Sequence, residues 1–309
     1  MERNCELIDG DYKRGVSCWR KNVESPRHCI PPSLSEAVLR VSHEFFESSH
    51  ENKIKMQLSS ATGFRGYQVI GQNVTKGMPD MHEAIDFYKE FNENAYGELG
   101  KPLCAPNLWP EIPSDFRITM ERYLIAMEEL AKRILRGIAL ALGGPPDAFE
   151  SSAASDPFWV LRVIGYPPLK ENKGSDDDNH SAFSCGAHTD YGLLTFVNQD
   201  AEPCALQVKN QVGEWIWAPH IPHTFVVNIG DMLQVFSNGL YHSTLHRVIN
   251  NSSLYRVSVP FFLEPNFNAG VEPFEFCRKG REANECLRLT ESPVIYGQHL
   301  VNKVLSNFY

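Results

Sequence analysis

Two histidines and one aspartate carry the clearest chemical signal in this sequence. His188 and Asp190 are separated by a single residue, and His246 follows in a later segment. Residues i and i+2 of a β-strand point to the same face, so we expect His188 and Asp190, at the start of one strand, to reach one metal ion. A neighbouring strand would supply His246. Two imidazoles and one carboxylate on one face of an octahedron leave three open positions, as in non-haem Fe(II) oxygenases.

A histidine and an aspartate two residues apart also arise by chance, so this motif needs support from elsewhere in the chain. Arg256 and Ser258 follow His246 and share one face of the next predicted strand. A buried guanidinium beside a hydroxyl is suited to binding a carboxylate through paired hydrogen bonds. Together these residues predict an Fe(II) site that also takes O₂ and 2-oxoglutarate, with Arg256 and Ser258 on the distal carboxylate.

The other histidines near these segments are interpreted as solvated or locally hydrogen-bonded side chains. His220 and His223 flank a proline in a predicted loop, and His180 follows the polar stretch 170–179, which we interpret as a solvated loop. His242 has the same strand parity as His246 and stays a weaker alternative ligand. Trp215 and Trp217 alternate along a predicted strand, which favours packing over stacking on a substrate.

The elements that must position these residues divide the chain into a helical first part, 1–150, and a strand-rich second part, 151–309, which we expect to form one structural unit. A capping box at Ser33-Leu34-Ser35-Glu36 predicts the start of one helix. Apolar spacing predicts a second helix over about 114–142, ended by glycines and prolines at 143–146, and a last one over about 296–307. Strands are predicted near 158–166, 192–198, 204–208, 214–217, 223–229, 231–236, 243–249 and 255–263. This pattern predicts a mainly β fold with flanking helices, a sandwich or jelly roll.

Composition excludes several classes of function. The chain carries 29 basic and 38 acidic residues, a formal net charge of −9, which argues against nucleic acid as a partner. Its eight cysteines are scattered without a C-x-x-C pair, which is typical of reduced, intracellular thiols. No signal peptide or apolar run long enough to cross a membrane is evident, so we expect a cytoplasmic protein with no membrane partner, acting as a monomer on a small molecule.

Several segments in order resemble one known family. The sequences GAHTDYGLLT (186–195), NIGD (228–231), STLHRV (243–248) and RVS (256–258) look like the plant-type 2-oxoglutarate- and Fe(II)-dependent dioxygenases, the isopenicillin N synthase-like group. Upstream, GFRGY (63–67) and NVTKG (73–77) are similar to the dark-inducible plant dioxygenases and their fungal relatives. The resemblance covers roughly residues 35–309.

The resemblance implies a double-stranded β-helix core packed against long helices, and iron ligands at His188, Asp190 and His246. It also implies that Tyr166 contacts 2-oxoglutarate together with Arg256 and Ser258. The expected reaction is hydroxylation of a small metabolite with release of succinate and CO₂, while desaturation or ring closure would use the same cofactors. One departure is Ile164, where the family commonly has Asn two residues before the tyrosine.

Residues 1–32 depart further from the family pattern. We find neither its short first strand nor its Asn-His-Gly segment, which predicts an unpaired edge on the core sheet and reduced stability. This departure and Ile164 favour an alternative, a catalytically degenerate jelly roll that binds a small molecule. A zinc hydrolase using the same three ligands is a weaker alternative, since no general base is evident. The sequence does not identify the substrate.

Overall fold

The structure is a computed structural model that describes residues 16–20, 30–169, 183–278 and 294–308. The predicted solvated loop at 170–179 and His180 lie outside these residues. The four cysteines whose side chains are described, Cys104, Cys185, Cys204 and Cys277, are free thiols. Among the described helices, none combines the length and apolar character needed to cross a membrane.

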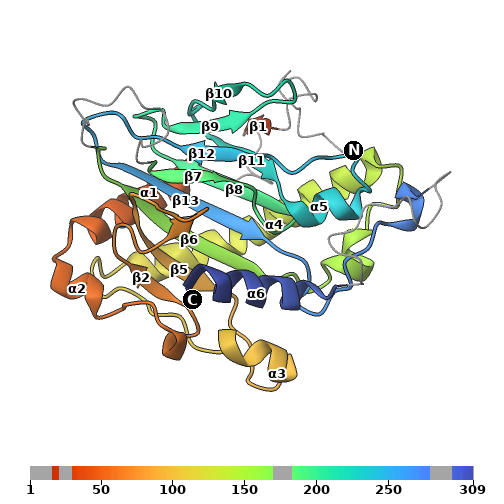
Figure 1. The fold of residues 1–309 in the computed structure, drawn as a ribbon, viewed down its shortest axis with the longest axis horizontal. Helices are drawn as coiled ribbons and strands as arrows, with labels where there is room; N and C mark the ends of the chain where they lie inside the picture. Colours follow the sequence, from red (N-terminus) through yellow and green to blue (C-terminus); the bar gives the residue numbers. More distant parts are fainter. Residues whose placement is uncertain (1–15, 21–29, 170–182, 279–293, 309) are drawn as a thin grey trace.

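Two antiparallel sheets form the body of the molecule, as the strand spacing predicted (Figure 1). The larger has seven strands in the order β1-β11-β8-β13-β6-β5-β2, and the smaller has four in the order β10-β9-β12-β7. Together with the similarity to solved jelly-roll enzymes reported below, this confirms the predicted fold class. The large sheet comprises β1 (Val16–Arg20), β2 (Gly66–Gln68), β5 (Glu83–Tyr88), β6 (Trp159–Tyr166), β8 (Leu194–Gln199), β11 (Thr224–Ile229) and β13 (Arg256–Leu263). The small sheet comprises β7 (Cys185–His188), β9 (Leu206–Lys209), β10 (Trp215–Trp217) and β12 (His246–Val248), and β3 (Val74–Thr75) and β4 (Met78–Pro79) form a separate pair.

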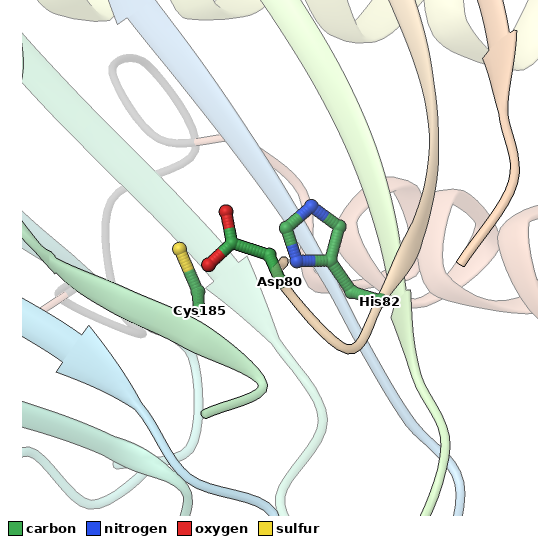
Figure 2. A group of neighbouring side chains, drawn as sticks. All are labelled: Asp80, His82 and Cys185. Carbon is green, nitrogen blue, oxygen red and sulfur yellow. The ribbon is translucent and has the colours of Figure 1, made fainter. Parts of the chain in front are cut away.

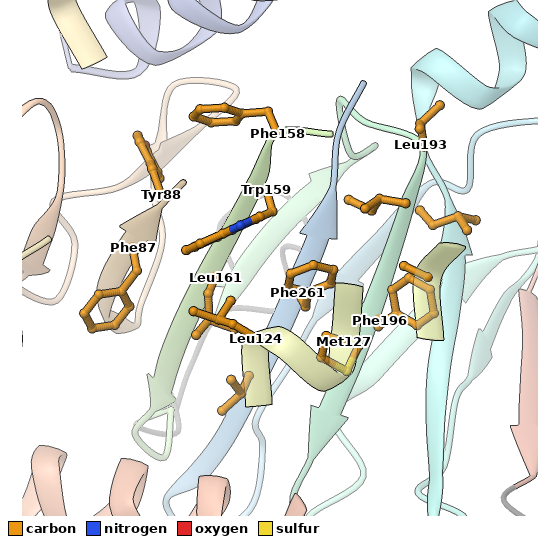
Figure 3. Packing of buried hydrophobic residues seen from close by; sticks show 14 of the residues in the cluster. Phe87, Tyr88, Leu124, Met127, Phe158, Trp159, Leu161, Leu193, Phe196 and Phe261 are labelled. Atoms are coloured by element: carbon orange, nitrogen blue, oxygen red, sulfur yellow. The ribbon is translucent and has the colours of Figure 1, made fainter. Parts of the chain in front are cut away.

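Helices cover the outer face of the large sheet. The long helix α4 (Phe116–Ala141) packs on β13 and on α1 (Pro32–Glu47), and its end at Gly143, which has a positive φ of 79°, matches the prediction. Figure 3 shows Leu161, Phe196 and Phe261, from three neighbouring strands, beside Leu124 and Met127 of α4. The remaining helices and turns are α2 (His50–Ile54), η2 (Ser60–Thr62), α3 (Gly97–Gly100), η3 (Lys101–Leu103), η4 (Phe149–Ala153), α5 (Asp231–Phe236), η5 (Glu275–Cys277) and α6 (Tyr296–Phe308).

Alternation along the strands separates this core from a cavity between the two sheets. Odd-numbered residues of β6 and β13 enter the core against α4, whereas even-numbered residues face the cavity. β13 lies between β6 and β8, with Phe261 opposite both Leu161 and Phe196. Strands from both sides of residue 150 are hydrogen-bonded neighbours, because β5 pairs with β6.

Three sequence expectations about the elements are wrong. Residues 231–236 form helix α5 and not a strand. The prediction failed because a short apolar run is equally typical of a buried helix and of a buried strand. Helix α1 begins at Pro32, because the first N–H groups of a helix have no partner within the helix and proline lacks that N–H. Ser33 therefore lies inside the helix and is not its N-cap. Finally, β1 pairs with β11 along five residues, so this edge is not left unpaired. Such pairing is a tertiary contact that a five-residue segment does not reveal by itself.

Candidate active site

The three predicted metal ligands converge at the small sheet. His188 ends β7 and His246 begins β12, and the two residues are direct cross-strand partners with ring centroids 4.3 Å apart. Asp190 lies in the turn after β7, so the predicted placement of His188 and Asp190 on one strand is wrong. The turn nevertheless brings Asp190 Oδ1 to 3.6 Å from His188 Nε2 and 3.7 Å from His246 Nε2. One atom from each residue lies within 4.8 Å of the others, so this group can hold one metal ion.

Backbone carbonyls orient both imidazoles toward this point. His188 Nδ1 lies 2.8 Å from the Gly186 carbonyl oxygen, and His246 Nδ1 lies 2.9 Å from the Thr244 carbonyl oxygen. A carbonyl oxygen can only accept a hydrogen bond, so each Nδ1–H donates to it and each Nε2 is directed at the point between the three residues. The geometry therefore presents two imidazole nitrogens for coordination.

The two imidazoles differ in how readily they release a proton. Burial lowers the pKa of His246, which favours the neutral form that binds a metal. Burial also acts to lower the pKa of His188, but Cys185 and Asp190 outweigh it and raise that pKa to about 10. A metal ion at this point would therefore take the place of a proton on His188 Nε2.

Asp190 is held in its ionised form. Thr195 Oγ1 and Asn228 Nδ2 both donate to Oδ2, at 2.5 and 2.7 Å, which leaves Oδ1 facing the imidazoles. Burial alone would raise the pKa of Asp190, but His246, His188 and these two hydrogen bonds outweigh it and hold the pKa below its usual range. A buried carboxylate with one oxygen directed at two imidazoles is a donor set that fits a divalent transition metal.

A cavity of about 440 Å³ opens beside these residues and is lined by side chains from both sheets and from α6. Arg256 lies at one end of it and is 1% exposed. Its Nη2 donates to Gln199 Oε1 at 2.6 Å, whereas Nε and Nη1 have no hydrogen-bond partner among the described residues. Burial lowers the pKa of Arg256, which means that its charge is costly where it lies. A buried guanidinium with two unsatisfied nitrogens fits the carboxylate of a bound organic acid.

The two residues predicted to act with Arg256 lie next to it. Tyr166 on β6 is its cross-strand partner, and the guanidinium carbon is 5.0 Å from the centre of the phenol ring. Burial raises the pKa of Tyr166 to about 12, so its hydroxyl keeps its proton and can donate. Ser258 lines the same cavity, opposite Ile164 on β6. Ile164 thus supplies an apolar wall where the family commonly has an amide.

The side chains interpreted as bystanders lie elsewhere. His242 is exposed in the loop before β12, and His220 and His223 lie between β10 and β11; none of the three lines the cavity. Trp215 stacks with Arg247, whose guanidinium carbon is 4.2 Å from the centre of the indole ring. Trp217 is 49% exposed.

A second group of potential metal ligands, Asp80, His82 and Cys185, lies close by (Figure 2). Asp80 and His82 are already held by hydrogen bonds within the protein. The two oxygens of Asp80 accept from Gly186 N at 2.8 Å, Asn73 Nδ2 at 2.6 Å and Thr75 Oγ1 at 2.8 Å. His82 Nδ1 lies 2.7 Å from the Ser184 carbonyl, and burial together with Arg162 lowers the pKa of His82 to about 4. This group therefore ties the segment before β5 to β7, and so fixes the strand that ends in His188.

Sequence reasoning missed the polar residues that line the rest of the cavity. These include Asp86, Arg162, Asp231, Glu264 and Lys303. Glu264 could have been predicted from the sequence, because it continues the series of even-numbered, cavity-facing residues that begins at Arg256. Lys303 had no such signal, because only the docking of α6 brings it to the cavity.

Comparison with known proteins identifies two family models along the chain. Residues 157–265 match the 2OG-Fe(II) oxygenase superfamily, and residues 26–112 match the N-terminal region of the non-haem dioxygenases in morphine synthesis. The first match contains all six predicted site residues.

Two plant relatives are identical to this chain at half of the aligned positions or more, and a third relative is more distant. A homoarginine-6-hydroxylase of Oryza sativa subsp. japonica is 54% identical over 281 residues, which cover 91% of this chain and 84% of the relative. A second homoarginine-6-hydroxylase, from Arabidopsis thaliana, is 50% identical over the same shares of both chains. A probable iron/ascorbate oxidoreductase of Dictyostelium discoideum is 34% identical, covering 90% of this chain and 82% of the relative.

Solved structures share the fold. A full-length Neurospora crassa protein in complex with alpha-KG and thymine has a TM-score of 0.75 and 27% identity, covering 92% of this chain and 85% of that one. The protein JOX2, in complex with 2OG, Fe and JA, has a TM-score of 0.75 and 25% identity, covering 96% and 82%.

Proposed function

Because this chain belongs to the 2OG-Fe(II) oxygenase superfamily, we propose that it hydroxylates a guanidino amino acid of the homoarginine type. The chain is a 2-oxoglutarate-dependent dioxygenase of small metabolites, and its cofactors are Fe(II), 2-oxoglutarate and O₂. The identity of 50–54% with named homoarginine-6-hydroxylases over 91% of the chain carries the substrate proposal. The Dictyostelium relative, a fungal clavatol oxidase and a fungal 2-oxoglutarate-dependent dioxygenase are more distant, at 34%, 31% and 32% identity.

We assign the iron to His188, Asp190 and His246. Support comes from the two Nε2 atoms directed at one point, the Oδ1 of ionised Asp190 beside them, and their separation of less than 4.8 Å. When bound, Fe(II) and 2-oxoglutarate supply the oxidising power: 2-oxoglutarate and O₂ yield succinate and CO₂, and one oxygen atom enters a substrate C–H bond. The protein orients the reactants and excludes bulk water.

We assign the distal carboxylate of 2-oxoglutarate to Arg256, with Ser258 and Tyr166 beside it. Two guanidinium nitrogens of Arg256 lack a partner among the described residues, and a carboxylate would satisfy them. Gln199 already holds the third nitrogen and so fixes the plane of the guanidinium. The anion therefore meets a preorganised group, and little entropy is lost in ordering it.

One carboxyl group of the cavity supports a cationic substrate. The lining carries the carboxyl groups of Asp86, Asp231 and Glu264 together with the basic side chains of Lys76, Arg162 and Lys303, so its overall charge does not select a ligand. Asp86 Oδ1 lies 3.4 Å from Arg162 Nε, whereas Glu264 is buried and forms no ion pair among the described residues. A cationic group of the substrate would supply that partner.

Turnover with a matched set of amino acids tests the proposal. Homoarginine, arginine, lysine and homocitrulline would be supplied separately with Fe(II), 2-oxoglutarate and O₂, while succinate formation and loss of the amino acid are measured. We expect both signals to be strongest with homoarginine and to match in stoichiometry. Succinate at the same background rate with all four compounds would refute the substrate class.

A further inference from the structure

One strand of the large sheet carries opposite charges at its two ends, both facing the same cavity. Arg256 begins β13, and Glu264 follows the strand directly, continuing the pairing through its N–H to the Phe158 carbonyl at 2.9 Å. Both line the cavity, together with Ser258, Pro260 and Phe262 between them. Eight residues at about 3.3 Å each separate the Cα atoms of the two residues by roughly 26 Å along the strand. The end that suits the 2-oxo acid is therefore distinct from the end that carries Glu264.

Glu264 is a buried carboxyl without a cationic partner. It is 3% exposed, and Tyr296 OH donates to its Oε2 at 2.5 Å. Within the described part of the chain, no lysine, arginine or histidine forms an ion pair with it. Burial raises its pKa to about 8, and the nearby charges of Asp190 and Asp231 add to this. Ionising a carboxyl group that is buried without a cation destabilises the fold. Buried carboxyl groups with strongly shifted pKa values concentrate at functional sites.

The backbone beside Glu264 leaves room for its carboxylate next to the metal site. A Cβ built on Gly192 would lie 2.0 Å from Glu264 Oε2, so only glycine at this position allows the carboxylate its place. Gly192 follows Asp190 by two residues, in the same turn. A cation bound to Glu264 is therefore adjacent to the loop that carries the metal-site carboxylate.

The other two carboxyl groups of the lining differ from Glu264 in pairing or in exposure. Asp86 Oδ2 accepts from Gln68 Nε2 at 2.6 Å, and its Oδ1 lies 3.4 Å from Arg162 Nε. Asp231 Oδ2 accepts from Thr189 Oγ1 at 3.3 Å, and Asp231 is partly exposed to solvent, whereas Glu264 is buried. Tyr296 occupies only one oxygen of Glu264, which leaves its Oε1 able to accept from a ligand.

We propose that Glu264, oriented by Tyr296, binds the guanidinium of the substrate and selects cationic over neutral side chains. The inference rests on the proposed function and deepens it. A guanidinium donates paired hydrogen bonds to a carboxylate, and in homoarginine C6 is the carbon bonded to the guanidino nitrogen. Binding that group beside the Asp190 turn brings C6 to the metal site, whereas the amino acid end extends toward the rest of the cavity.

Binding measured without turnover tests the inference. Homoarginine and homocitrulline, in which a neutral urea replaces the guanidinium, would be titrated anaerobically into the Fe(II)- and 2-oxoglutarate-loaded protein, monitored by its charge-transfer absorption. We expect Glu264→Gln to bind homoarginine about 100-fold more weakly than the wild type and homocitrulline within a few-fold, with 2-oxoglutarate affinity unchanged. Glu264→Asp, which keeps the charge, should keep the preference for homoarginine. Glu272→Gln, an exposed carboxylate paired with Arg278, is the matched control and should bind like the wild type.

The outcomes separate this inference from the proposed function. If the wild type binds and hydroxylates homoarginine, and Glu264→Gln still binds homoarginine more tightly than homocitrulline, Glu264 does not recognise the guanidinium. Only this inference then fails. If the wild type forms the 2-oxoglutarate complex and binds homocitrulline as tightly as homoarginine, the proposed substrate class fails with it. If Glu264→Gln does not fold, retention of the preference in Glu264→Asp supports the charge as its basis, and loss of the preference overturns it.

Discussion

Replacing Arg256 with methionine should make the protein more stable without ligand and unable to hold 2-oxoglutarate. The guanidinium is 1% exposed, with one hydrogen bond to Gln199 and two nitrogens unpartnered in the described structure. Leaving a buried charge without its partner costs about 3–5 kcal/mol, and a hydrophobic side chain of similar volume avoids that cost. The wild type recovers this energy only when a carboxylate binds.

The same energy sets the size of the effect on binding. A loss of about 3–5 kcal/mol corresponds to a decrease in 2-oxoglutarate affinity of roughly 100- to 5,000-fold. At a ligand concentration 100 times the dissociation constant, 2-oxoglutarate should stabilise the wild type by about 2.7 kcal/mol. The variant should show no such stabilisation at that concentration.

Urea denaturation with Fe(II) under anaerobic conditions, with and without 2-oxoglutarate, measures both effects on one sample. We expect the variant to unfold at a higher urea concentration than the ligand-free wild type, and 2-oxoglutarate to shift only the wild type. Gln207→Met, on the small sheet and hydrogen-bonded to Arg247, controls for polar-to-apolar replacement away from the 2-oxo acid end. An equal shift by 2-oxoglutarate in Arg256→Met and wild type would refute the assignment of Arg256.

Three other sites give further expected outcomes. Asp190→Asn should abolish the Fe(II)- and 2-oxoglutarate-dependent absorption band while the far-UV circular dichroism stays unchanged; an intact band would exclude Asp190 as a ligand. Glu83→Gln should lower the free energy of unfolding in urea by about 3–5 kcal/mol, because it leaves the buried ammonium of Lys53, which lies 2.8 Å from Glu83 Oε2, without a counter-charge. Adding Lys53→Met to the same chain should recover much of the loss. The pKa of Glu264 is raised to about 8 in the folded protein, so the stability it contributes is present below about pH 4.5 and lost as the pH rises through 8. In urea denaturation of the metal-free protein, Glu264→Gln should therefore have a free energy of unfolding similar to the wild type near pH 5 and a larger one at pH 8.5, by at most about 5 kcal/mol; a difference independent of pH would contradict the raised pKa.

The residues that we assign to the metal and to the 2-oxo acid could be picked out from the sequence because short motifs carry them. The structure brings His188, Asp190 and His246 together, although the strand argument used for Asp190 was wrong: the turn after β7, and not strand parity, brings its carboxylate to the imidazoles. Arg256 and Ser258 were placed correctly on one strand face, because alternation along β13 is regular. The helices were predicted where their apolar stripe is long, as in α4, and α5 was missed because six residues are too few to show a period.

The remaining parts of the site depend on contacts between distant segments. The hydrogen bond from Gly186 N to Asp80 joins residues 106 positions apart. No local sequence pattern predicts that Asp80 fixes the strand that ends in His188. Likewise, Tyr296 reaches Glu264 from a helix at the end of the chain. Propensity and spacing describe one segment at a time, so a polar group whose partner comes from another layer looks like an ordinary surface residue.

The assigned metal ligands and the residues proposed to bind the substrate lie on different parts of the scaffold. This separation explains how the fold can keep its reaction while its substrate changes. Two of the three assigned metal ligands lie on the small sheet, whereas the residues of β13 that line the cavity alternate with residues of the core packed on α4. A substitution at Glu264 alters the cavity roughly 26 Å along the strand from Arg256 and leaves the odd-numbered core residues untouched. Substrate charge can therefore be changed at one end of β13 without moving the 2-oxo acid at the other. The cost of Glu264 to the unliganded fold is the expected signature of a residue kept for binding and not for stability.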